Sequence, residues 1–172
     1  MTDSEQRTVV PWLGPEPREL RFEAHPDDDD VRAALARFLD VDSKLRDLAE
    51  PHLIEYCRDI CAHWPSAWAQ PSISLEHPGD IWKHVTLGGV VQVSRRADGD
   101  DEDGIYFLIE CGCAWEEEHG LQLVVRDGRT IAKVGGFDGH LTNTDAFGNP
   151  DLVGVVYVSI DWCRAQLSAR RR

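Results

Sequence analysis

The chain has 172 residues, 42% of them hydrophobic and 28% charged, so it is long enough for one hydrophobic core and has a globular composition. The formal net charge is −13, from 31 acidic and 18 basic residues. An acidic surface repels nucleic-acid phosphates and anionic membranes, so these two partners are excluded, whereas a basic protein is an electrostatically favourable partner.

The sequence also predicts where the protein resides. No run of about 18 apolar residues is present to cross a membrane, and the first residues lack the basic start and apolar stretch of a signal peptide. We therefore expect a cytoplasmic protein. Its five cysteines are odd in number and fit no small disulfide framework, so we expect them to be thiols.

The N-terminal segment, residues 1–25, contains four residues that break helices and interior strands: Pro11, Gly14, Pro15 and Pro17. We interpret this segment as an extended arm with one short edge strand at residues 20–22. Apolar side chains would attach the arm to the core, namely Trp12, Leu20 and Phe22.

Residues 26–66 form the predicted helical segment. The aspartates at residues 27–30 are typical of a helix start, because carboxylates accept the free backbone N–H groups there and complement the helix dipole. Apolar side chains then recur at helical spacing to about residue 64. Pro51 either stops or kinks this pattern or begins a new helix, so two or three helices are expected.

From residue 73 to residue 162 the pattern changes to that of a β-sheet. Stretches rich in β-branched and aromatic residues are predicted as strands: residues 73–75, 81–85, 90–94, 105–111, 121–126, 130–134 and 152–160. Asp127-Gly128 is the strongest hairpin signal, because a type I′ turn requires a positive φ at both residues. A short helix is expected at residues 162–167.

Helices followed by consecutive strands, without alternating βαβ units, are typical of an α+β fold. The sequence therefore predicts a single domain over residues 1–172, in which N-terminal helices pack on a mainly antiparallel, meandering β-sheet. Within residues 105–111 both the odd and the even side chains are apolar, so this strand is predicted to be central and covered on both faces.

The loop at residues 97–104 combines five acidic residues with two glycines. It resembles a calcium loop in composition, but no glutamate follows at the EF-hand position, and strands rather than helices are expected on either side. We therefore do not assign calcium to this loop.

Two loops, residues 114–120 and 135–146, hold the candidate functional residues. These are seven candidate binding residues: Trp115, Glu116, Glu118, His119, Asp138, His140 and Asp145. In a meander both loops leave the sheet at the same end, so His119 and His140 are predicted to be neighbours. Two histidines with nearby carboxylates are suited to bind a divalent metal or to act as a general acid and base.

The known catalytic motifs do not support an enzyme. The sequence contains no H-E-x-x-H, C-x-x-C, G-x-S-x-G, Walker or G-x-G-x-x-G motif. In the simpler interpretation, the glutamates of the first loop are solvated and the two histidines hydrogen-bond the turns. We therefore assign no catalytic residue, no metal ligand and no cofactor, and favour a non-enzymatic role.

Parts of the sheet region resemble a family of bacterial proteins of unknown function that share a W-[DE]-x-E-H-G-L pattern followed by D-G-x-x-x-x-V-G and D-G-H-L. The matching stretches are residues 115–121, 127–128 with 134–135, which here have five residues between them, and 138–141. The resemblance covers about residues 80–147 and not the helical third. It implies no activity, and by analogy such proteins are accessory or immunity-type proteins rather than enzymes.

Three functional hypotheses result. The leading one is a non-enzymatic protein-binding domain whose acidic surface associates with a basic partner such as a toxin. The second is a metal-dependent hydrolase that uses the loops of His119 and His140. The third is a small-molecule sensor with a pocket between the sheet and the helices, lined by Trp82, Trp115 and Tyr106.

Overall fold

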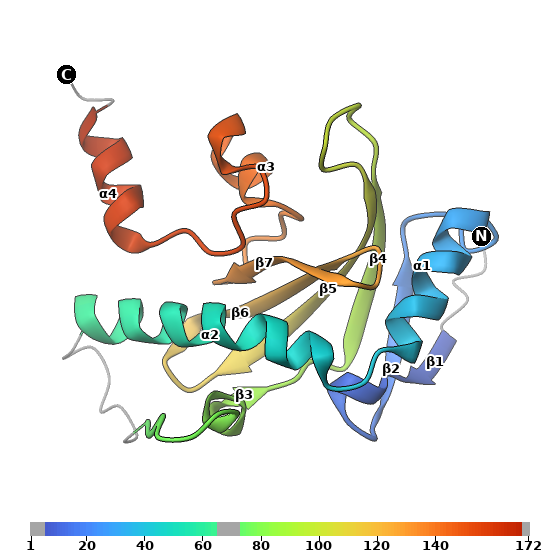
Figure 1. Ribbon diagram of the computed structural model, residues 1–172, viewed down its shortest axis with the longest axis horizontal. Helices are drawn as coiled ribbons and strands as arrows, with labels where there is room; N and C mark the ends of the chain where they lie inside the picture. The colour runs from blue at the N-terminus through green and yellow to red at the C-terminus, as the bar shows by residue number, and fades with distance from the viewer. Residues whose placement is uncertain (1–5, 65–72, 170–172) are drawn as a thin grey trace.

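The computed structural model describes residues 6–64 and 73–169. It confirms the α+β class, with N-terminal helices packed on a mixed, mostly antiparallel sheet of seven strands (Figure 1). The strand order is β1-β2-β4-β5-β6-β7, and β3 pairs with one end of β5. The strands are β1 (Gln6–Val9), β2 (Pro17–Phe22), β3 (Val85–Thr86), β4 (Val90–Arg96), β5 (Gly104–Cys113), β6 (Glu116–Arg126) and β7 (Thr130–Gly135).

The helices are α1 (Asp29–Asp40), α2 (Lys44–His63), α3 (Asn143–Phe147) and α4 (Ile160–Ala169), with three 3-10 turns, η1 (Pro11–Leu13), η2 (Asp80–His84) and η3 (Pro150–Leu152). The predicted helix start is confirmed, because Asp28 is the N-cap of α1 and two further aspartates occupy its first turn. Pro51 is exposed inside a continuous α2, so the segment contains two helices. Residues 65 and 66 of the predicted helical segment lie outside the described residues.

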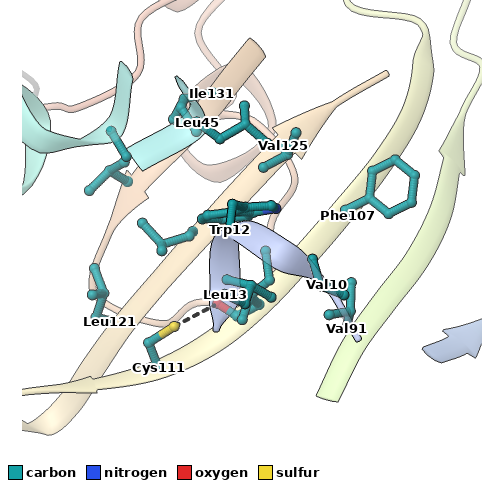
Figure 2. Close-up of a cluster of buried hydrophobic side chains, with 14 of the residues drawn as sticks. Val10, Trp12, Leu13, Leu45, Val91, Phe107, Cys111, Leu121, Val125 and Ile131 are labelled. Carbon is teal, nitrogen blue, oxygen red and sulfur yellow. Dashed lines mark hydrogen bonds between the residues drawn. The ribbon is translucent and has the colours of Figure 1, made fainter. Parts of the chain in front are cut away.

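The N-terminal arm is a larger part of the fold than its prolines suggest. The strand predicted at residues 20–22 is confirmed as part of β2. It pairs with β1 on one side and in parallel with β4 on the other, so its predicted position at the sheet edge was wrong. Pro11 and Pro17 are accommodated because each is the first residue of its element. Trp12 and Leu13 are buried among side chains of the helices and the sheet (Figure 2).

The main core lies between the helices and one face of the sheet. Phe38 of α1 stacks on Phe107 of β5 at a ring-centroid distance of 4.2 Å. On the opposite face, Tyr106 and Leu108 form a second small cluster with Leu141. Odd and even residues of β5 are therefore both covered, which confirms the prediction of a central strand.

Three of the predicted strands were wrong. Residues 73–75 have no regular structure, residues 81–84 belong to η2, and residues 153–159 form no strand, although Val134 N–H donates to the carbonyl of Val156 at 2.9 Å. A short apolar run has the same composition whether it is buried in a strand, a 3-10 turn or an extended segment, so composition could not separate them.

The Asp127-Gly128 turn is confirmed, with φ of 52° and 69°. A Cβ on Gly128 would lie 2.5 Å from the carbonyl oxygen of Ala34, because α1 packs directly against this turn. None of the five cysteines is in a disulfide, so all are thiols, as predicted. In the described part of the chain, no helix is long and apolar enough to cross a membrane.

Candidate functional site

The β5–β6 hairpin is regular except near its turn, where β6 bulges. Cys111 lies opposite Leu121 and Cys113 opposite Glu116, so one residue of β5 faces four residues of β6. These four, Glu117, Glu118, His119 and Gly120, are called the bulge below. The segment predicted as a loop at residues 114–120 is therefore mainly strand with a large bulge, and the turn itself is only two residues long. Bulges of this kind redirect side chains.

Hydrogen bonds from two directions fix the backbone of the bulge. Glu116 Oε1 accepts the backbone N–H groups of Glu118 (2.9 Å) and His119 (3.2 Å). From α2, the Tyr56 hydroxyl donates to the carbonyl oxygen of Gly120 at 3.1 Å. The Glu116 carboxylate is thus used by the fold and is not available as a ligand group.

Buried residues anchor both ends of the bulge. Trp115 and Leu121 are fully buried, and the Trp115 ring meets Tyr56 edge to face at 5.9 Å. Gly120 has a φ of +60°, and a Cβ there would lie 2.9 Å from the carbonyl oxygen of Cys111. Glycine is therefore required at this position both by the backbone conformation and by space.

The side chains of the other three bulge residues, Glu117, Glu118 and His119, do not anchor the bulge. Glu117 and Glu118 are exposed, and their carboxylates form no hydrogen bond or ion pair with any described residue. The His119 side chain is 63% exposed, and its closest polar approach is Nδ1 to Glu116 Oε2 at 3.6 Å. These three side chains remain available to a ligand or partner.

Asp138, in the second candidate loop, is the centre of a hydrogen-bond network. Lys133 Nζ, only 3% of whose side chain is exposed, donates to both carboxylate oxygens at 2.7 and 2.6 Å. Gln122 Nε2 and the His140 N–H also donate to Asp138, while Gln122 Oε1 accepts the N–H groups of Asp138 and Gly139. The Asp-Gly-His sequence therefore closes this loop on β6 and β7.

Asp145, the last candidate, pairs with Arg96 on β4. The Arg96 guanidinium is 6% exposed, donates to Asp145 at 3.0 Å and to Asp100, and lies near Asp98 and Asp103. Hydrogen bonds to Asp100 and then Asp145 raise the pKa of Arg96. An internal arginine thus pairs with aspartates of the acidic loop at residues 97–104, where the sequence only resembled a calcium site.

The two candidate loops do lie side by side, as the meander predicted. Phe137 N–H donates to the carbonyl oxygen of His119 at 3.0 Å, and a Cβ on Gly136 would lie 3.5 Å from the His119 Cβ. The imidazoles of His119 and His140 are both exposed and make no contact with each other. Within residues 6–64 and 73–169, no group of three or more His, Cys, Asp or Glu side chains is arranged to hold a metal ion.

A groove lies beside the bulge, next to the segment that connects β3 to β4. It has two lobes of about 420 and 610 Å³, which share four lining residues: Thr86, Gly112, Glu117 and Gly120. Lys83, His84 and Glu116 line the smaller lobe. The larger lobe is completed by Gly88, Gly89, Glu110, Glu118, His119 and Phe137.

Two cysteines line this groove, but neither is an activated nucleophile. Burial raises the pKa of Cys111 to about 11 and that of Cys113 to about 12. Both are therefore thiols at neutral pH, whereas nucleophilic attack requires the thiolate.

The residues proposed for a sensor pocket do not lie together. Trp115 is buried in the main core, and Tyr106 belongs to the cluster on the opposite face of the sheet. Trp82 lies beneath the guanidinium of Arg46, 5.2 Å from the ring centroid. These three side chains do not line one pocket.

The groove residues that sequence reasoning did not single out include Thr86, Glu110, Glu117 and Phe137. The available signal was the pair Gly88-Gly89, because two adjacent glycines are typical of a turn between two strands. In the structure these glycines separate β3 from β4, and a Cβ on Gly88 would lie 1.8 Å from the carbonyl oxygen of Glu110.

The fold and the site define a mixed-sheet α+β domain with a glycine-lined, acidic groove at a β-bulge. The chain belongs to the family described as Domain of unknown function (DUF6985), whose model matches residues 2–141. The match includes the helical third, whereas the resemblance in the sequence covers only about residues 80–147. No curated protein and no solved structure matches the chain.

Proposed function

We propose that this chain is a protein-interaction domain that binds a basic segment of a partner protein in the groove. The observation that carries the proposal is the charge of the larger lobe, whose ionisable side chains other than a thiol are Glu110, Glu117, Glu118 and His119. No lysine or arginine lines it, and the net charge of −13 would accelerate association with a basic partner. A bacterial, immunity-type role against a basic toxin is the more specific form of this proposal.

The lining of the groove suits a cationic chain segment. Gly89 has open space at its Cβ position, which allows a partner backbone to approach closely there. Phe137 is 39% exposed at the rim, where its ring is available to an arginine or lysine side chain. The free carboxylates of Glu117 and Glu118 would then be paired only in the complex.

The test is calorimetric titration with a short peptide rich in lysine and arginine, at about 25 mM and about 150 mM salt. The variant Glu117→Lys/Glu118→Lys should weaken binding at least about tenfold, because two favourable charges become repulsive. The control Asp40→Lys/Asp101→Lys makes the same change of net charge at exposed positions outside the groove.

Two results would contradict the proposal. One is an absence of binding by the wild-type protein even at the lower salt concentration. The other is an equal loss of affinity in the groove variant and in the control, which would mean that the peptide senses only the overall charge. A natural basic partner would be sought by pull-down at both salt concentrations, with the groove variant as the negative bait.

A further inference from the structure

His63, the last residue of α2, joins this helix to α4. Its Nδ1 lies 2.8 Å from the carbonyl oxygen of Asp59, and its Nε2 lies 3.0 Å from Oδ1 of Asp161 on α4. Both partners are hydrogen-bond acceptors. A neutral imidazole carries one N–H and the protonated imidazolium carries two, so only the charged form can satisfy both partners.

Few other contacts hold α4. The Asp59 carboxylate accepts the Tyr157 hydroxyl at 2.8 Å and the Ile160 N–H at 3.0 Å. The Arg164 guanidinium lies 6.0 Å from the centroid of the Trp64 ring. None of residues 160–168 is buried, although the Trp162 ring meets the Phe147 ring of α3 edge to face at 5.5 Å and Ile160 packs against the main core. The polar contacts at the end of α2 therefore position the helix together with these apolar contacts.

We propose that α4 and the extended segment before it, residues 153–159, form a latch that protonation of His63 closes. The latch covers the outer side of β7, where Val134 N–H donates to the carbonyl of Val156. When His63 loses a proton, one of its two hydrogen bonds is lost and the latch opens more often. Opening uncovers β7, an edge strand whose backbone groups can then pair with another chain segment.

The latch also touches the residue that supports the bulge. The Tyr157 ring lies 5.7 Å from that of Tyr56, whose hydroxyl holds the Gly120 carbonyl. The latch lies wholly beyond residue 141, where the match to the family model ends. It is therefore a device added to the matched part of the chain, and its action can be measured without any partner.

The charged groups that face His63 are Asp59 on its own helix and Asp161 and Arg164 on α4. Hydrogen bonds to the Asp59 carbonyl and then to Asp161 raise the pKa of His63, while burial and Arg164 oppose the shift. A pKa raised in the closed state means that closure is favoured fully below the ordinary pKa of histidine. The contribution of His63 protonation to closure is lost as the pH rises through the raised pKa of His63.

The experiment measures hydrogen-exchange protection factors, which are corrected for the intrinsic pH dependence of exchange, for the amides of Ile160 and Cys163. These amides donate to Asp59 and to the carbonyl of Ser159. Between about pH 5.5 and about pH 8.5, protection in the wild-type protein should fall by up to about tenfold for each pKa unit that separates closed from open His63.

Three variants make the assignment specific. His63→Gln should remove the pH dependence, whereas the matched control His52→Gln, on the same helix, should keep it. Asp161→Asn should keep the latch closed at higher pH, because its amide can donate to a neutral imidazole. A proton titration of the His63 imidazole by NMR adds a readout that needs no variant.

The proposal is overturned by wild-type protection that does not change with pH, or by equal flattening in the His63 and His52 variants. It is also overturned if the measured pKa of His63 is at or below the ordinary value of about 6.5. Should His63→Gln fail to fold, the wild-type titration and the Asp161→Asn profile still decide the matter.

Discussion

Gly120→Ala is the sharpest test of how the bulge is built. Gly120 has a φ of +60°, and the new Cβ would lie 2.9 Å from the Cys111 carbonyl, a backbone atom that cannot rotate away. Gly148 offers a matched control, with a φ of +59° and open space around its Cβ position. Gly148→Ala therefore carries only the backbone strain, about 1–2 kcal/mol.

Gly120→Ala should cost about 2–4 kcal/mol in the free energy of unfolding, because the overpacking at Cys111 adds about 1–2 kcal/mol to the same strain. Urea unfolding followed by tryptophan fluorescence measures both variants, since Trp115 lies at the bulge. Equal costs for the two substitutions would refute the close approach of β5 to the bulge, and with it the register that defines this site.

Three further predictions concern the polar residues around the site. Asp138→Asn should cost about 2–4 kcal/mol, because Lys133 stays buried with its charge poorly paired, and adding Lys133→Met should recover part of the loss in urea unfolding. Lys83 and a backbone N–H hold the pKa of Asp80 at about 2, so its contribution to stability is present above the ordinary pKa and is lost as the pH falls towards 2. Asp80→Asn should reduce the fall in stability between the ordinary pKa of aspartate and pH 2 in an acid-unfolding curve. Tag-free protein should contain fewer than about 0.1 metal equivalents by elemental analysis, since three of the four candidate carboxylates, those of Glu116, Asp138 and Asp145, are used by internal partners. A full equivalent would revive the hydrolase hypothesis.

The parts of the fold that local chemistry specifies were predictable. The helix start at the aspartates of α1 and the Asp127-Gly128 turn both lie where the sequence indicated, because each signal spans only a few residues. The role of the N-terminal arm was not predictable in this way. β2 pairs with β4, some seventy residues later in the chain, and no local pattern in the arm specifies that partner.

The site was predictable to a similar extent. The meander alone placed the loops of His119 and Asp138 together, because alternate connections leave the sheet at the same end. The bulge was not predictable, since it depends on a register change between β5 and β6 that arises from contacts with Tyr56 and Phe137. The register between β5 and β6 is therefore needed to tell which of the seven candidate residues are buried or paired and which are exposed.

Residues 116–118 show why the distinction between paired and exposed residues matters. The same substitution to alanine should reduce stability at Glu116 but reduce peptide binding at Glu117. Glu116→Ala leaves two backbone N–H groups without their acceptor and should cost about 1–3 kcal/mol in stability. Glu117→Ala removes no internal contact and should change stability by less than about 0.5 kcal/mol, while weakening binding of the basic peptide. Paired urea unfolding and peptide titration separate the two effects. Equal stability losses at both positions would show that the bulge carboxylates act together in the fold, and the groove would then have no free charge to offer a partner.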